Sequence, residues 1–211
     1  MPHHLEFFHT PQTRSTGVLA LLKELDAEFT VHRIDQKAGE QRKPEYLALN
    51  PMGKVPAILH GGALVTEQVA IYLYLADLYP DAALAPRIGD PLRGPYLRWV
   101  AFYGSCFEPA VVDRSLKREQ APRGLCPYGD YDTMLSTLTT QLEKGPYLLG
   151  EVFSAADVLW GNALGWTTAF GLVPKLPAIT QYVERIMGRP AIAAAVASDA
   201  AAVASDAAAV G

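Results

Sequence analysis

Cysteine and long apolar runs are both scarce in this chain of 211 residues. Only Cys106 and Cys126 occur, too few for a disulfide framework and too far apart for a Cys-x-x-Cys site. The N-terminus lacks the uninterrupted apolar stretch of a signal peptide, and no run is expected to span a membrane. These features predict a reduced, cytoplasmic protein without a membrane partner.

An excess of charge of either sign is also missing. Eighteen Lys and Arg stand against 22 Asp and Glu, a formal net charge of −4, which argues against nucleic acid as a partner. The five histidines show no spacing to cysteines or carboxylates that is typical of metal ligands, so no metal site is expected. Residues 31–54 are locally basic; this suits a small anionic ligand, and a solvated helix face explains it equally well.

The first 79 residues alternate between short apolar runs and helical periodicity. Runs at 5–8 and 29–34 predict strands, and the segment between them predicts an amphipathic helix. That helix has apolar residues at i, i+3, i+4 and i+7, namely Val18, Leu21, Leu22 and Leu25. A short helix is expected at 44–49. The order strand, helix, strand implies that the two strands are parallel.

A hairpin and a further helix are predicted next. Two apolar runs flank Gly61-Gly62 within residues 55–65, which is typical of a tight β-hairpin. Thr66 then has the residue type of a helix N-cap. The predicted order of elements over residues 1–79 is therefore βαβαββα.

The chain after this region has helical periodicity. Prolines and glycines concentrate at 80–91, which predicts a linker, and residues 92–190 are expected to be all-helical. Within them, Ser154 and Asp157 have the spacing of a capping box. The tail at 191–211 repeats Ala-Ala-Val-Ala-Ser-Asp-Ala; with one valine per repeat, we expect it to add little to stability.

The motifs of residues 50–79 resemble the second half of the N-terminal domain of cytosolic glutathione transferases. The matching segments are Asn50-Pro51, Lys54-Val55-Pro56, Thr66-Glu67, Val69-Ala70-Ile71 and Tyr74-Leu75-Ala76-Asp77. Phe153–Asp157 resembles a capping box in the C-terminal domain of the same family. The resemblance implies a thioredoxin-like α/β domain at 1–79, an all-α helical bundle at 92–190 and a homodimer. It also implies glutathione as a co-substrate, with no separate cofactor.

The resemblance carries several binding residues onto this chain. In the family a Val-cis-Pro pair binds the cysteinyl backbone of glutathione, which implies Val55 and Pro56. Glu67 and Gln68 are implied for the γ-glutamyl end of glutathione. The helix that begins there has free N–H groups at its N-terminus, which favour the carboxylate of the ligand. Two further residues, Gln41 and Lys54, are implied as contacts to the glycine carboxylate. The candidates for a pocket that binds a small hydrophobic electrophile are Thr10, Tyr103, Cys106 and Phe107, and core packing is the alternative for the last three.

Activation of the thiol needs a hydrogen-bond donor or a positive charge near the sulfur. Transferase classes place Tyr, Ser or Cys in the first loop, but residues 10–15 contain neither Tyr nor Cys. Thr13 and Ser15 remain as candidate catalytic hydroxyls, and Arg14 as a source of positive charge. Helix capping is an equally good interpretation of Ser15, and Thr10 and His9 are weaker candidates for activation.

The sequence therefore predicts a glutathione transferase that conjugates the glutathione thiolate to small electrophiles. One alternative is a glutathione-binding or protein-interaction module without catalysis, which the missing Tyr or Cys keeps open. Another is a glutathione-dependent isomerase or dehalogenase of the same fold. A thiol–disulfide oxidoreductase acting through its own cysteines is disfavoured, because both cysteines lie outside residues 1–79.

Overall fold

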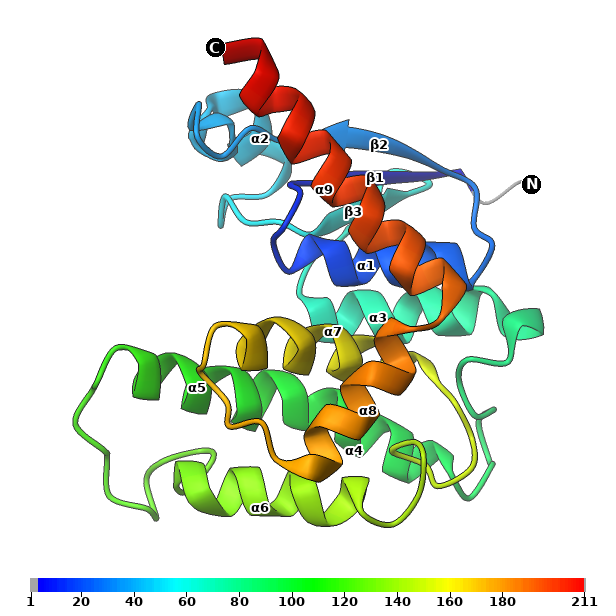
Figure 1. Ribbon diagram of the computed structural model, residues 1–211. Helices are drawn as coiled ribbons and strands as arrows, with labels where there is room; N and C mark the ends of the chain where they lie inside the picture. Colours follow the sequence, from blue (N-terminus) through cyan, green and yellow to red (C-terminus); the bar gives the residue numbers. More distant parts are fainter. Residues whose placement is uncertain (1–3, 211) are drawn as a thin grey trace. The chain divides into compact units, whose positions relative to one another are not determined.

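The computed structural model describes residues 4–210 and divides the chain into two compact units (Figure 1). Unit 1 comprises the residues up to Ala82 together with those from Arg189 onward, and unit 2 comprises Ala83–Gly188. The C-terminal segment thus belongs to the same unit as the N-terminal domain, whereas the sequence suggested a separate tail.

Unit 1 is built on a four-stranded sheet with the order β2-β1-β3-β4. Strand β1 pairs in parallel with β2 and antiparallel with β3, and β3 and β4 form the predicted hairpin. The strands are β1 (Leu5–His9), β2 (Phe29–Arg33), β3 (Ala57–His60) and β4 (Ala63–Val65). The helices are α1 (Ser15–Glu24), α2 (Pro44–Leu49), α3 (Gln68–Leu78) and α9 (Pro190–Val210), with short 3-10 turns η1 (Glu40–Arg42) and η2 (Pro80–Ala82). The predicted βαβαββα order is confirmed.

Strand β1 directs its side chains alternately to the two faces of the sheet. Leu5, Phe7 and His9 are buried, and His9 meets α1 through Ser15. Phe8 points to the opposite face, where its ring lies 5.8 Å from that of Tyr46 in α2. One face of β1 therefore carries α1, and the other carries α2.

The start of α3 differs from the sequence prediction. The helix begins at Gln68 and its N-cap residue is Glu67, so the assignment of Thr66 as the cap was wrong. The preceding strand β4 ends at Val65, and two residues rather than one connect it to the helix. The bond between Val55 and Pro56 is cis, as the family resemblance implied.

Unit 2 is all-helical over its described residues. Its elements are α4 (Arg93–Phe102), the π-helical turn η3 (Tyr103–Phe107), α5 (Glu108–Ser115), α6 (Tyr131–Leu142), α7 (Ala155–Ala169) and α8 (Pro177–Met187). The predicted capping box at the start of α7 is confirmed. Its Asp157 is fully buried and also accepts hydrogen bonds from the Leu148 amide at 2.8 Å and the Tyr182 hydroxyl at 2.9 Å. This carboxylate therefore joins two helices and a loop of the unit.

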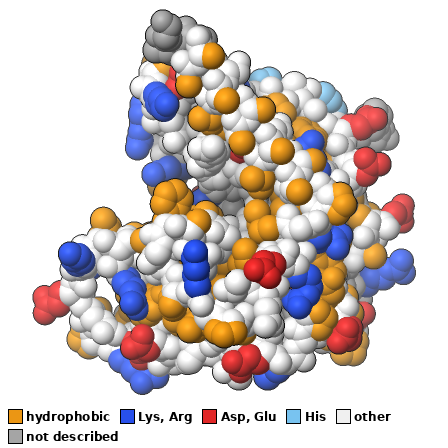
Figure 2. All heavy atoms as spheres, viewed as in Figure 1, with side chains coloured by type: hydrophobic (Ala, Val, Ile, Leu, Met, Phe, Trp, Pro, Cys, Tyr) orange, Lys and Arg blue, Asp and Glu red, His pale blue; other side chains and the backbone are white. Residues whose placement is uncertain are grey.

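The C-terminal repeat was expected to add little to stability, and its packing in the structure favours a larger contribution. Residues 190–210 form the helix α9, which packs along α1 (Figure 1). Ile192, Ala195 and Asp199 are buried at helical spacing, whereas Val196 is exposed. The buried side of α9 therefore uses isoleucine, alanine and aspartate, Val203 is half-buried, and many of the alanines lie on the surface (Figure 2).

Charged side chains fix α9 against the rest of unit 1. Arg189 donates two hydrogen bonds of 2.8 Å to Glu24 at the end of α1. In the first copy of the repeat, Asp199 accepts hydrogen bonds from His9, Thr16 and the Gln12 amide near the start of α1. Because the two contacts lie at opposite ends of α1, the two helices run antiparallel. Asp206, one repeat later, pairs with Arg33 at the surface.

By length and mean hydropathy, residues 190–208 also meet the criteria for a membrane span, contrary to the expectation from the sequence. Composition argues against that use. Asp199 lies at the midpoint of the 19 residues, where an aspartate costs about 2.5–3.5 kcal/mol on insertion scales. The same carboxylate accepts hydrogen bonds from His9, Thr16 and the Gln12 amide within unit 1. We therefore interpret α9 as a packed helix of unit 1.

Two truncations test this interpretation. Deletion of residues 197–211 removes Asp199 and should lower the free energy of unfolding by about 1.5–3 kcal/mol, the range for a hydrogen bond to a charged group. Deletion of residues 204–211 keeps Asp199, loses the exposed pair of Asp206 with Arg33, and should cost less than about 1 kcal/mol. Urea denaturation measures both, and equal losses would contradict the assigned role of Asp199.

Candidate functional site

The sheet topology brings three predicted segments to the same end of unit 1. Phe8 of β1 pairs with Ala57 at the start of β3, so the loop after His9 lies beside Val55-Pro56. Ile58 of β3 pairs with Val65 at the end of β4, so the start of α3 lies on the other side of the same residues. The candidate site is therefore formed by loop 10–14, residues 54–56 and residues 67–68.

The segment before β3 is held by hydrogen bonds to one carbonyl. The Lys54 carbonyl accepts from the Tyr46 hydroxyl at 2.6 Å and from the buried Asn50 side chain at 2.8 Å. Gly53 has a φ of +58°, and a Cβ there would lie 2.6 Å from the Gln41 carbonyl. A side chain at this position would push apart the two segments that carry Gln41 and Lys54, so glycine is required.

The start of α3 combines backbone strain with a link to the first loop. Glu67 has φ +63° and ψ 119°, a sparsely populated conformation for a residue with a side chain, and such strain is concentrated at functional sites. Its carboxylate is exposed. The Gln68 side-chain amide donates to the Arg14 carbonyl at 3.1 Å, which ties this helix end to loop 10–14.

The two candidate hydroxyls of the first loop have different surroundings. Ser15 is fully buried, and its Oγ lies 2.8 Å from each of His9 Nδ1, Thr13 Oγ1 and the Thr10 carbonyl. Thr13 is half-buried, and its hydroxyl lies 2.7 Å from the Thr10 carbonyl. The N-cap residue of α1 is Arg14, so the capping role suggested for Ser15 was wrong.

The sequence analysis missed a buried carboxylate beside this loop. Asp199 of α9 accepts a hydrogen bond from His9 Nε2 at 2.9 Å and another from the Gln12 amide at 3.0 Å. Burial raises the pKa of Asp199, but the hydrogen bonds from His9, Thr16 and Gln12 outweigh it, and the pKa is below its ordinary value. The repeat that contains Asp199 offered no signal, because Asp206 has the same sequence neighbours.

The remaining predicted residues are spread over both units. Lys54 is exposed, and Gln41 is half-buried with its amide nitrogen 3.5 Å from the Gln36 carbonyl. Thr10 donates its hydroxyl to the Ile34 carbonyl at 2.7 Å, which holds the loop against the end of β2. The other electrophile-pocket candidates belong to unit 2.

Burial speaks against a pocket role for two of those candidates. The rings of Tyr103 and Phe107 lie 5.8 and 4.9 Å from that of Trp160, and both side chains are buried. They are core residues of unit 2, the alternative that the sequence had offered. Cys106 is half-buried, with its sulfur 3.5 Å from Ser105 Oγ. These residues form the π-helical turn η3, a feature that often occurs at functional sites.

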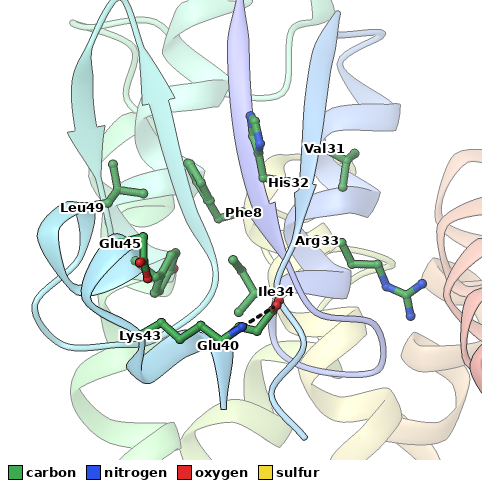
Figure 3. A pocket seen from close by; sticks show the side chains of 10 residues that line it. Phe8, Val31, His32, Arg33, Ile34, Glu40, Lys43, Glu45 and Leu49 are labelled. Carbon is green, nitrogen blue, oxygen red and sulfur yellow. Dashed lines mark hydrogen bonds and ion pairs between the residues drawn. The ribbon is translucent and has the colours of Figure 1, made fainter. Parts of the chain in front are cut away.

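A separate cavity of about 780 Å³ opens on the α2 face of the sheet (Figure 3). Phe8, His32 and Tyr46 line it together with an ion pair between Lys43 and Glu40. His9 and Ser15 lie on the other face, and the described residues that line this cavity include none of the predicted glutathione contacts. We therefore place the candidate site at the sheet end and not in this cavity.

Within residues 4–210, no group of three His, Cys, Asp or Glu side chains is arranged to hold a metal ion. His3, one of the five histidines considered above, lies outside the described residues.

Comparison with known proteins agrees with this architecture. Residues 4–77 match the model of the glutathione S-transferase N-terminal domain, and residues 129–190 match that of the C-terminal domain. A thioredoxin-like domain followed by an all-helical domain is the architecture that defines the class. The chain belongs to the glutathione S-transferase family.

Its relatives include bacterial enzymes. The chain is 27% identical to glutathione S-transferase GstA of Escherichia coli O157:H7 over 92% of its own length and 98% of that protein. It is 35% identical to Protein LigF of a Sphingobium species, over 86% and 88% of the two chains. A sphingomonad glutathione S-transferase complexed with glutathione has a TM-score of 0.77 at 30% identity, covering 92% of this chain and 98% of that one.

Proposed function

We propose that this protein is a glutathione transferase that conjugates the glutathione thiolate to small electrophiles. The observation that carries the proposal is the convergence of loop 10–14, Val55-Pro56 and the strained start of α3 at one end of the sheet. This arrangement offers a backbone edge for a peptide, an exposed carboxylate and a half-buried hydroxyl. Membership of the family and a relative solved with glutathione support it.

The three segments suit the parts of a γ-glutamyl tripeptide. The start of α3 presents backbone N–H groups to the γ-glutamyl carboxylate, and Glu67 pairs with its ammonium group. Residues 55 and 56 bind the cysteinyl backbone as an added strand does. Lys54 is exposed and supplies a positive charge for the glycine carboxylate, with Gln41 on the segment beside it.

For the thiol we assign Thr13 rather than Ser15. Ser15 is fully buried and surrounded by four hydrogen-bonding groups within unit 1, so its hydroxyl does not reach a ligand. Thr13 is half-buried. Its hydroxyl, which donates to the Thr10 carbonyl in the structure, turns to the sulfur and stabilises the thiolate. The thiolate then attacks an electrophilic carbon, a carbon–sulfur bond forms, and a leaving group such as halide departs while the thiol proton goes to solvent.

A second candidate function uses the same bound thiolate. One relative, 27% identical over 91% of this chain, is the disulfide-bond oxidoreductase YfcG of E. coli K12. A glutathione thiolate attacks a disulfide sulfur to give a mixed disulfide and release the other thiol. A panel of four substrates distinguishes the activities: an aryl halide tests for a transferase, a disulfide for an oxidoreductase, a haloalkane for a dehalogenase and an isomerisable double bond for an isomerase. Glutathione binding without turnover of any of them would indicate the non-catalytic alternative.

The proposed role of Glu67 predicts a loss of glutathione affinity in Glu67→Gln. The change removes one charge-assisted hydrogen bond and should weaken binding by about 1–3 kcal/mol. Calorimetry measures this, with Glu45→Gln as the matched control, because Glu45 is an exposed glutamate in the first turn of α2. Equal affinities of the two variants would remove Glu67 from the site.

The assignment of Thr13 predicts that the two hydroxyl variants change different quantities: Thr13→Val the thiolate fraction, and Ser15→Ala the free energy of unfolding. Thr13→Val should lower the thiolate fraction of bound glutathione about tenfold or more at neutral pH, since one hydrogen bond to a charged group is lost. Ser15→Ala should mainly lower the free energy of unfolding, by about 1–3 kcal/mol, because buried partners lose a hydrogen bond. Thiolate absorbance and urea denaturation separate the two, and a larger thiolate loss in Ser15→Ala would reverse the assignment.

The family also suggests a cytoplasmic homodimer, and we include both in the proposal. Sedimentation equilibrium at micromolar concentration should give twice the chain mass of 22.9 kDa. Isologous dimers are the commonest soluble assemblies. A mass of 22.9 kDa across the concentration range would contradict the dimer without affecting the proposed glutathione site.

A further inference from the structure

A buried chain of hydrogen bonds connects helix α9 to the loop that carries Thr13. Asp199 Oδ1 lies 2.9 Å from His9 Nε2, His9 Nδ1 lies 2.8 Å from Ser15 Oγ, and Ser15 Oγ lies 2.8 Å from Thr13 Oγ1. Asp199, His9 and Ser15 are 3, 5 and 0% exposed. Four residues from three elements and a loop of unit 1 thus form one continuous path.

The order Asp–His–Ser is that of a nucleophilic triad, but the surroundings of Ser15 exclude that chemistry. Its Oγ accepts a hydrogen bond from the Thr10 amide at 3.1 Å and is also 2.8 Å from the Thr10 carbonyl. With 0% exposure, it has no room for a substrate carbonyl, which a serine nucleophile must approach directly. The path therefore serves to hold the loop.

The charge of Asp199 fixes the direction of the hydrogen bonds. An ionised carboxylate only accepts, so His9 Nε2 carries a proton and donates it to Asp199. If the ring is neutral, Nδ1 accepts from the Ser15 hydroxyl, and Ser15 Oγ then becomes an acceptor for Thr13. If the ring is charged, Nδ1 donates to Ser15, and the Ser15 proton is available to Thr13 Oγ1. The Thr13 proton, which the Thr10 carbonyl accepts at 2.7 Å in the structure, can then turn to an anion outside the loop.

The second arrangement is the one that suits a thiolate at Thr13. In this arrangement the Thr13 hydroxyl can donate to an anion at the loop, while His9 Nε2 still donates to Asp199 at 2.9 Å. Other charged groups near these elements have partners of their own. Arg33, which is paired in register with His9, binds Asp206, and Glu24 at the far end of α1 binds Arg189.

We propose that Asp199 is a positioning residue that acts through His9 and Ser15 to orient the Thr13 hydroxyl toward the glutathione sulfur. The inference rests on the proposed function for its ligand, but the geometry of the path does not depend on it. The repeat supplies an internal comparison. Asp199 and Asp206 both stand in the sequence Val-Ala-Ser-Asp-Ala-Ala-Ala, yet Asp199 is buried on this path and Asp206 lies at the surface beside Arg33.

The test compares Asp199→Asn with Asp206→Asn in the full-length protein. Each substitution keeps the size of the side chain and removes its charge. We expect the thiolate fraction of bound glutathione at pH 6.5 to fall about three- to tenfold in Asp199→Asn, with the dissociation constant of glutathione changed less than about threefold. Because nucleophilicity falls with basicity, turnover should fall only about two- to threefold. Asp206→Asn should match the wild type in all three measurements, and equal thiolate fractions in the two variants would overturn the proposal.

A coupling measurement separates positioning from a general loss of structure. In a Ser15→Ala background the path is already broken, so Asp199→Asn should change the thiolate fraction less than about twofold. An undiminished effect in that background would mean that Asp199 acts on the sulfur by another route and would overturn the role of His9 and Ser15.

If Asp199→Asn does not fold, the wild-type protein still decides the question. The ring ¹⁵N resonances of His9 should shift when glutathione binds as a thiolate and remain in place when S-methylglutathione binds. Identical spectra with the two ligands would overturn the proposal. If the wild-type protein binds no glutathione, the proposed function fails, and hydrogen exchange at the Thr10 amide then tests the path alone. Exchange at least about threefold faster in Asp199→Asn than in Asp206→Asn supports the path. Equal exchange in the two variants overturns it.

Discussion

Strand β1 is the constraint on which unit 1 depends, because it is bonded on both edges and packed on both faces. Its pairing with β3 determines which residues lie beside the first loop, and its alternation sends His9 inward to α1 and Phe8 outward to α2. A shift of one residue would exchange the two faces. The candidate site would then lose His9 from the buried path and Val55-Pro56 from the edge of the loop.

Binding and activation are separable in this arrangement. Most of the residues assigned to glutathione come from the segment before β3 and from the start of α3, and the residue assigned to the sulfur comes from the loop after β1. They meet through the hydrogen bond between Gln68 and the Arg14 carbonyl. Positioning of a bound reactant contributes more to rate than a modest change in thiol basicity, so the proposed transferase activity is compatible with threonine in place of tyrosine or cysteine.

Much of the fold followed from local patterns. Residues 44–49 form a helix as predicted, and the capping box at Ser154 and Asp157 is present, because short-range hydrogen bonds and hydrophobic spacing determine both. The cap of α3 was misplaced, since Glu67 adopts a conformation that residue type does not favour. The family resemblance implied which residues bind glutathione, and these stay a prediction; it could not choose between Thr13 and Ser15. That choice depends on burial, which tertiary contacts decide.

The C-terminal repeat shows why composition was misleading. Counting large apolar side chains gave a weak helix, but alanine allows close packing and a carboxylate with several donors adds directional contacts. Asp199 is buried at little net penalty because His9, Gln12 and Thr16 replace the water it loses. Asp206 has an identical local sequence and pairs with an exposed arginine, where an ion pair contributes about 0–1 kcal/mol. The difference between the two aspartates therefore comes from what each one meets in unit 1. Asp199 lies beside the start of α1, whereas Asp206, seven residues further along α9, lies at the surface.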